Sequence, residues 1–314
     1  MTVLVTGATG NVGQEVVRAL RARGIPVRAA ARGADPVASA FEDDDGVSLV
    51  RLDFLDSKTF ASAADGCSAL FLLRPPPISD VKATMNRFVD AARERGVRQI
   101  VFLSVAGAEK NKLVPHHAVE VHLAARSDDW TVLRAGFFSQ NLGDAYRRDI
   151  VEDRRIYVPA GRGRAAFVDV RDVADVAASA LVDPEAHRAK AYTLTGPAPV
   201  SFEEAAATLS DALGRTIRYE PASVAGYALH LHRRGIPATQ IAVQTLLHVG
   251  IRFGRAAAVD ATLGALLARP RRTLRDYVFD HVAMWHVEVP TASDGDRKGR
   301  PRRAIDGEDA ALAR

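Results

Sequence analysis

The chain has 314 residues, of which 47% are hydrophobic and 25% are charged, and its formal net charge is +4. This length is enough for one large α/β domain, or for a nucleotide-binding domain with a smaller cap, and it can bury a sizeable core. The small charge surplus is too diffuse to indicate a nucleic-acid partner. The single cysteine, Cys67, excludes an intramolecular disulfide, a Cys-x-x-Cys redox pair and a thiolate metal cluster.

The N-terminal stretch "TVLVTG" reads as a strand and lacks the basic and apolar regions of a signal peptide. No later apolar run approaches the roughly 20 residues that are needed to cross a bilayer. We therefore expect a cytoplasmic protein without a membrane segment.

Short β-branched runs alternate with segments of helical period over the first 135 residues. Strands are expected at "TVLVT", "PVRAAA", "VSLVRL", "ALFLL", "RQIVFLS" and "WTVLR". Buried parallel strands linked by crossover helices give this alternation, so the sequence predicts an α/β fold with a Rossmann-type doubly wound parallel sheet. Gly24 and Gly96 stand where helices should end, and Ser79 is the expected N-cap of a helix that begins at "DVKATM".

The second half of the chain is less regular. Ser201 and Glu204 have the spacing of a capping box, and residues 222–285 read as mostly helical. We expect a nucleotide-binding domain over residues 1–150, followed over 151–289 by the remaining strands and a smaller helix-rich cap. Residues 290–314 have little apolar content and mixed charge, which predicts a disordered tail rather than a nucleic-acid arm.

The stretch "VTGATGNVG" places three glycines between a predicted strand and a predicted helix. Gly7 allows a tight turn, Gly10 allows the backbone to approach a pyrophosphate, and Gly13 allows the helix to pack on the sheet. The phosphates would then lie at the N-terminus of the helix. The context makes this a strong dinucleotide signature.

The end of the second predicted strand carries Arg32 and no acidic residue before Asp35. An NAD-preferring site would have Asp or Glu there for the ribose 2′-hydroxyl, whereas a guanidinium binds a 2′-phosphate. The sequence therefore favours NADP(H), unless Arg32 is an ordinary surface residue. After the third strand, Asp53 and Phe54 are candidates for the adenine, although Asp53 and Asp56 are equally well explained as helix caps.

With these features the chain resembles the NmrA-like atypical short-chain dehydrogenase/reductases, which are relatives of type 2 NADPH:quinone oxidoreductases. The matching segments are "VTGATGNVG", "FLLRPP", "HHAVEVHL", "WTVLRAGFFSQNL", "FVDVRDVADVA" and "RPRRTLRDYVFDH", within residues 1–285. The resemblance implies the following roles: Gly7, Thr9, Gly10, Asn11, Val12 and Gly13 at the pyrophosphate; Arg32 at the 2′-phosphate; Asp53 and Phe54 at the adenine; Leu72 and Leu73 under the nicotinamide ribose; Gly136, Phe137 and Phe138 at the nicotinamide.

Most short-chain reductases protonate their product with a Tyr-x-x-x-Lys pair, but here the matching positions are His116 and Glu120. Residues four apart share a helix face, so a Glu120 carboxylate would stabilise a protonated His116 that donates a proton or a hydrogen bond, with Ser104 nearby. The alternative is a helix surface pair. His117 and His122 do not complete a metal-binding face, and we expect no metal site.

Without the tyrosine, a ketone is a poorer substrate than a quinone, because a hydroquinone anion is far less basic than an alkoxide. We therefore expect an NADPH-dependent oxidoreductase that transfers hydride to a conjugated small molecule such as a quinone. Phe138, Gln140 and Asn141 would line the acceptor, unless Phe137 and Phe138 are a core pair. The alternative function is a non-catalytic NADP(H) sensor that acts through a protein partner. Either protein would be a monomer or a homodimer.

Overall fold

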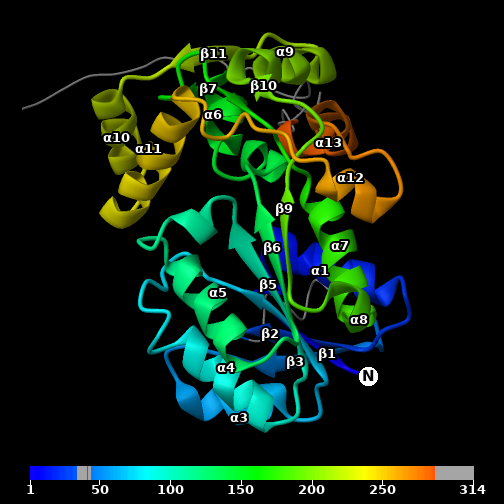
Figure 1. Ribbon diagram of the computed structural model, residues 1–314. Helices are drawn as coiled ribbons and strands as arrows, with labels where there is room; N and C mark the ends of the chain where they lie inside the picture. The colour runs from blue at the N-terminus through cyan, green and yellow to red at the C-terminus, as the bar shows by residue number, and fades with distance from the viewer. Residues whose placement is uncertain (34–40, 42–43, 287–314) are drawn as a thin grey trace, which may run out of the picture.

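The computed structural model describes residues 1–33, 41 and 44–286, so the expected tail over 290–314 lies outside the described residues. Its centre is a seven-stranded parallel sheet in the order β3-β2-β1-β4-β5-β6-β9, which confirms the predicted doubly wound fold (Figure 1). The strands are β1 (Val3–Thr6), β2 (Val27–Ala31), β3 (Val47–Arg51), β4 (Ala69–Leu73), β5 (Gln99–Val105), β6 (Trp130–Ala135) and β9 (Lys190–Leu194).

Helices cover both faces of the sheet. In β1, Val3 and Val5 pack against α1 (Asn11–Arg21) and α7 (Val170–Val182), whereas Leu4 faces α3 (Phe60–Ala64), α4 (Met85–Glu94) and α5 (Pro115–Arg126). Because successive side chains of a strand point to opposite faces, a strand covered on both sides must be apolar throughout. This explains the unbroken runs such as "VLVT" and "ALFLL".

The helix after β4 begins later than the sequence predicted. Ser79 is not its N-cap, because residues 81–84 form turns and α4 starts at Met85. Asp80 stabilises these turns: its Oδ1 atom accepts a hydrogen bond from the Ala83 amide at 3.1 Å, and its main-chain oxygen accepts another from the Thr84 hydroxyl.

The chain leaves the sheet after β6 to build a second lobe, returns as α7, α8 (Pro184–His187) and β9, and then completes the lobe. Two small sheets, β7-β11 and β8-β10, support the lobe helices. The expected capping box of Ser201 and Glu204 is present at the start of α9. The lobe elements are α6 (Arg147–Glu152), β7 (Arg155–Val158), β8 (Arg164–Ala165), β10 (Val200–Ser201), α9 (Phe202–Leu213), β11 (Arg218–Pro221), α10 (Val224–Arg233), α11 (Ala238–Arg252), α12 (Thr262–Leu267) and α13 (Leu274–Asp280).

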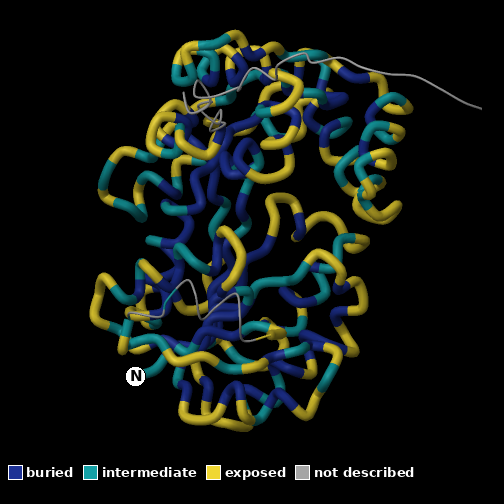
Figure 2. The backbone as a smooth tube through the Cα atoms, turned by 180° about the vertical axis from the view of Figure 1, so that it is seen from behind, coloured by how far each residue is buried: buried dark blue, intermediate teal, exposed yellow. Residues whose placement is uncertain are grey.

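Burial follows this arrangement. Figure 2 shows the strands of the large sheet as a buried spine that leads up into the lobe, with exposed residues concentrated on the outer turns. The lobe has its own aromatic core, which includes Phe167, Phe202 and Trp285, all at most 1% exposed. The helices α9, α10, α11 and α13, which pack around this core, confirm the helix-rich C-terminal region expected from the sequence.

The carboxyl edge of the sheet faces this lobe. β1 lies between β2 and β4, so the chain crosses to opposite sides of β1, and open α/β sheets bind their ligands outside the strand ends at such a point. None of the helices that the structure describes is long and apolar enough to span a membrane. The same residues contain no cluster of three or more His, Cys, Asp or Glu side chains suited to a metal ion.

Candidate active site

The glycine turn after β1 has the geometry that a pyrophosphate needs. Gly7 has φ +65°, and a Cβ placed on Gly13 would overlap the Gly7 carbonyl and lie 2.9 Å from the Cα atom of Ala8. α1 begins at Asn11, and no side chain caps its first turn within the described residues. Thr9, Gly10 and Asn11 are exposed, while Val12 and Gly13 are buried. The free amides at this helix end fit a dinucleotide phosphate.

The two arginines of the second strand differ in their surroundings. Arg28 points toward the turn after α3, where its Nη1 atom donates to the carbonyl oxygens of Ala63 and Asp65. Arg32 follows the last residue of β2 and is exposed, and its guanidinium makes no hydrogen bond to another described residue. Contact of Arg32 with a 2′-phosphate therefore stays a prediction, whereas Arg28 is already bound to main-chain oxygens.

The segment after β3 is partly explained by local structure. Asp56 accepts a hydrogen bond from the Lys58 amide as an N-cap, and the Asp53 Oδ1 atom accepts one from the Leu55 amide at 2.9 Å. The Phe54 ring packs edge-on against Phe88 in the core and is 8% exposed. Asp56 is thus a cap residue, while contacts of Asp53 and Phe54 with an adenine stay a prediction.

The end of β4 touches the glycine turn. Leu72 is fully buried, and a Leu73 methyl group would be 3.0 Å from a Cβ placed on Gly7. Arg74 follows directly, and its Nη1 atom donates to the carbonyl oxygens of Pro75 at 3.2 Å and Pro76 at 3.1 Å and to that of Ile78. Arg74 therefore stands at the carboxyl edge in a fixed orientation.

His116 and Glu120 do not interact as the sequence predicted. Both are 9% exposed, so they are not a surface pair either. Glu120 accepts from the Ser104 hydroxyl and forms an ion pair of 2.6 Å with Arg134. The expectation that Glu120 stabilises a protonated His116 is wrong, because this carboxylate is already engaged.

His116 instead contacts Arg74. Its Nε2 atom is 3.3 Å from the Arg74 Nε atom, and its ring lies 5.9 Å from that of Phe102. Burial, together with the positive charge of Arg74, lowers the pKa of His116 to about 4. The imidazole is therefore neutral at pH 7, so it can offer a hydrogen bond but not a readily available proton.

The loop after β6 divides into core residues and residues near the edge. Phe137 packs against Phe167 and Phe202 with ring centroids 5.2 and 6.1 Å away, so it belongs to the lobe core. Phe138 and Asn141 are half-buried. The amide of Gly136 is also engaged, since it donates to the Leu194 oxygen at 2.9 Å.

The Gln140 side chain is fully engaged within the protein. Its Nε2 atom donates to Asp169 at 3.0 Å, and its Oε1 atom accepts from the Val170 amide at 3.1 Å. The expectation that its amide faces the acceptor is wrong, because both ends of that amide are bound to the start of α7.

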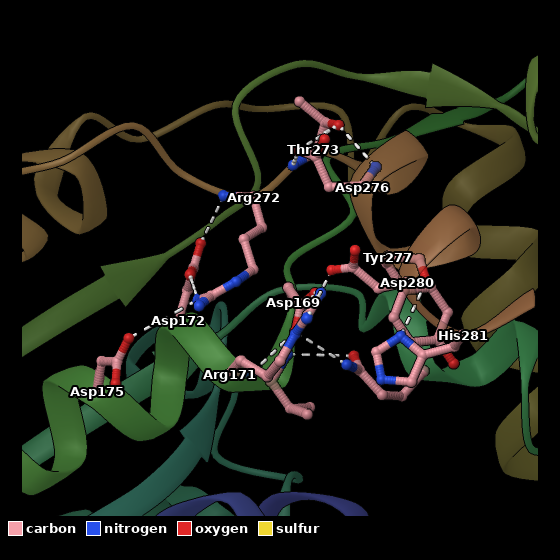
Figure 3. Close-up of polar contacts among 12 residues, drawn as sticks. Asp169, Arg171, Asp172, Asp175, Arg272, Thr273, Asp276, Tyr277, Asp280 and His281 are labelled. Atoms are coloured by element: carbon pink, nitrogen blue, oxygen red, sulfur yellow. Dashed lines mark hydrogen bonds and ion pairs between the residues drawn. The ribbon is translucent and has the colours of Figure 1, made fainter. Parts of the chain in front are cut away.

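Two buried carboxylates near the start of α7 join the sheet to the C-terminal segment (Figure 3). Asp169 accepts hydrogen bonds from Arg171, which also pairs with Asp280 at 2.7 Å. Asp172 binds the side chains of Arg269 and Arg272. Asp169 also binds Gln140 and so fixes the loop after β6. We call this set the α7 clasp: Gln140, Asp169, Arg171, Asp172, Arg269, Arg272 and Asp280.

Sequence reasoning assigned no role to Arg74, Arg134 or the α7 clasp. A signal for each was present, because "FLLRPP", "TVLRAG", "FVDVRDVADVA" and "RPRRTLRDY" all place charged residues beside apolar runs. Charges that border a buried strand or helix need partners. The sequence could not tell which partner each residue has.

Comparison with known proteins agrees with this geometry. A family model described as NAD(P)H-binding matches residues 7–184. The chain is 31% identical over 288 residues to an NAD(P)H azoreductase of Xenophilus azovorans, covering 90% of this chain and 98% of the relative.

Solved structures of reductases that bind NADP(H) superpose on this chain. A triphenylmethane reductase of Citrobacter sp. complexed with NADP(H) superposes with a TM-score of 0.77 and 26% identity, over 89% of this chain and 99% of that one. An NADPH-dependent quinone oxidoreductase of Escherichia coli, complexed with NADPH, gives a TM-score of 0.78 at 26% identity, over 90% of this chain and 100% of that one. The transcriptional regulator NmrA, at 18% identity and a TM-score of 0.71, shares the fold.

Proposed function

The chain belongs to a family of NAD(P)H-binding oxidoreductases, and we propose that it transfers hydride from NADPH to a conjugated acceptor, preferably a quinone. The glycine turn holds the pyrophosphate, and Arg32 selects the 2′-phosphate. When bound, NADPH supplies two electrons and one proton as a hydride, and the acceptor takes one further proton from water.

One observation carries the choice of acceptor: the histidine that replaces the usual tyrosine is buried against Arg74, and this burial and the charge of Arg74 lower its pKa to about 4. At pH 7 such a group cannot protonate a strongly basic alkoxide in the same step. An acceptor whose reduced form is a weakly basic anion needs only a hydrogen bond. Quinones have this property, and a cationic triphenylmethane dye needs no proton at all, because hydride addition makes it neutral.

Two buried tyrosines of the lobe, Tyr146 and Tyr219, offer no replacement acid. Tyr146 is 3% exposed and bonded to His248, and burial raises its pKa well above the usual value. Burial likewise raises the pKa of Tyr219 to about 12. Neither phenol gives up a proton readily near neutral pH.

The test is NADPH oxidation by the purified full chain with 1,4-naphthoquinone, an azo dye, a triphenylmethane dye and an unconjugated ketone. We expect turnover with the quinone or the dyes and none with the ketone. NADPH binding without oxidation by any conjugated acceptor would leave the NADP(H) sensor as the better interpretation. Turnover of the ketone at a similar rate would contradict the choice of acceptor class.

A further inference from the structure

We propose that Arg74 is a positioning residue that holds His116 in the neutral tautomer with its proton on Nδ1, and that this Nδ1–H binds the reducible oxygen or nitrogen of the acceptor. The inference deepens the proposed function and rests on it. It assigns a role to one residue, Arg74, that no sequence motif explained, and it makes His116 a hydrogen-bond donor rather than an acid.

The tautomer follows from the Arg74 contact. An arginine Nε–H can only donate, and a guanidinium keeps its protons in proteins. The Nε2 atom of His116, 3.3 Å from that Nε atom, must therefore present its lone pair. A neutral imidazole has one proton, so the proton is on Nδ1.

Arg74 cannot easily turn away from His116. Its Nη1 atom is held by three carbonyl oxygens of the turn over residues 75–78. The guanidinium therefore keeps its Nε–H toward the imidazole. A protonated His116 would direct a second N–H at this cation, which is unfavourable for both groups.

The Nδ1 atom of His116 is buried and has no hydrogen-bond partner among the residues that the structure describes. Most buried polar atoms in proteins are paired, so an unpaired donor calls for an explanation, and a binding site is one. His116 is in the first turn of α5, next to Arg74 at the carboxyl edge. Arg74 in turn follows Leu73, the residue that touches the glycine turn.

The surrounding charges favour a neutral imidazole. On α5 itself, Glu120 is paired with Arg134 from β6. On α4, Asp90 is paired with His122 and Arg126. Arg74 is thus the charged group in direct contact with His116, and burial and this charge together lower the pKa of the histidine.

The chemistry then needs no proton from the enzyme during hydride transfer. The acceptor gains a hydride and becomes an anion, while NADPH is oxidised to NADP⁺. The Nδ1–H stabilises the developing negative charge, as a preorganised donor does. Water protonates the anion afterwards, so that two electrons and two protons are added to the acceptor in all.

The first experiment measures the tautomer directly in the wild-type chain. Long-range ¹H–¹⁵N spectra of ¹⁵N-histidine-labelled protein distinguish Nδ1–H from Nε2–H, and the His116→Gln variant assigns the signal. We expect the Nδ1–H form without titration from pH 5.5 to 8. An Nε2–H form, or protonation with a midpoint above pH 6, would overturn the proposal.

The second experiment compares Arg74→Met with Arg98→Met, a change at an exposed arginine. Arg74→Met should convert His116 at least partly to the Nε2–H form and raise its midpoint of titration, whereas Arg98→Met should change neither. We also expect kcat for 1,4-naphthoquinone to fall about tenfold in Arg74→Met with little change in the KM for NADPH. An unchanged tautomer in a folded Arg74→Met variant would contradict the positioning role. If that variant does not fold, Arg74→Lys takes its place, because one ammonium cannot serve the imidazole and three carbonyl oxygens together.

The third experiment places the donor at the acceptor. Full-length protein saturated with NADP⁺ cannot reduce a quinone, so adding 1,4-naphthoquinone reports binding alone. We expect the His116 Nδ1–H resonance to move downfield, and an unmoved resonance at saturating quinone would overturn the assignment. Turnover with the wrong tautomer would reject this inference alone, whereas the right tautomer without turnover of any acceptor would reject the proposed function.

Discussion

Gly13 in α1 lies directly against the carbonyl group of Gly7, the residue that follows β1, with no room for a Cβ atom between them. The atoms that an added Cβ would meet, the Gly7 carbonyl and the Ala8 Cα, belong to the main chain, so they cannot move aside at low cost. We expect Gly13→Ala to destabilise the fold by about 1–3 kcal/mol and to weaken NADPH binding at least tenfold. Urea unfolding and NADPH fluorescence titration measure the two effects.

Gly264→Ala is the matched control for this substitution. Gly264 lies in α12, where an added Cβ would meet the Arg271 side chain at 3.6 Å, an ordinary contact. Alanine is favoured over glycine in a helix by up to about 1 kcal/mol. Stability should be maintained or rise, and equal losses in both variants would show that the Gly7 contact is not the cause.

Arg32→Ala tests the cofactor preference. A charge-assisted hydrogen bond to a phosphate contributes about 1.5–3 kcal/mol, so NADPH should bind roughly 10- to 100-fold more weakly while NADH changes little. Arg28→Ala removes the arginine that is bound to main-chain oxygens, and it should affect both cofactors alike. Isothermal titration calorimetry with NADPH and with NADH measures the two affinities in each variant. Equal losses in Arg32→Ala would remove this residue from the 2′-phosphate site.

Asp172→Asn tests the α7 clasp. Asp172 is fully buried and bonds to Arg269, the Arg272 side chain and, at 2.8 Å, the Arg272 amide. Breaking a buried ion pair by removing one partner costs roughly 3 kcal/mol or more. Chemical unfolding should show that loss, whereas Glu152→Gln, in an exposed pair with Arg148, should cost less than about 1 kcal/mol. A loss of similar size in both variants would contradict the role of the clasp.

His248 should make stability depend on pH. Burial lowers its pKa to about 4, below the usual value of 6.5, so the unfolded chain binds more protons than the folded chain between these values. The neutral histidine therefore stabilises the fold fully above pH 6.5, and this contribution is lost as the pH falls through 4. The shift corresponds to about 3 kcal/mol.

The measurement is the difference in unfolding free energy between the wild type and His248→Gln at several pH values. His116 titrates in both proteins, so its effect cancels. The difference should narrow by about 3 kcal/mol from pH 7 to pH 4. His286→Gln, at an exposed position, gives the baseline. A constant difference over this range would show that His248 does not titrate as the structure implies.

The sequence predicted the sheet, the glycine turn and the lobe because their signals are local. A run such as "VLVT", or a glycine that admits no side chain, depends on immediate neighbours. The partners of Glu120 could not be predicted in the same way. Its spacing from His116 is right for a helical pair, but Arg134, on a neighbouring strand, offers a better-placed charge. Gln140 was misplaced for the same reason, since Asp169 approaches it only in the folded chain.

The α7 clasp can form only late in the synthesis of the chain, because the partners of Asp172 lie far along the sequence. Arg269 and Arg272 follow Asp172 by 97 and 100 positions. At about 5–20 residues per second, the ribosome needs roughly 5–20 s to supply them. β9, the last strand of the large sheet, ends at Leu194, well before these arginines. A nascent chain that has passed Leu194 but has not reached Arg269 holds every strand of the large sheet, while the Asp172 carboxylate has neither of these arginines. We expect proteases that spare the finished protein to cut such a chain.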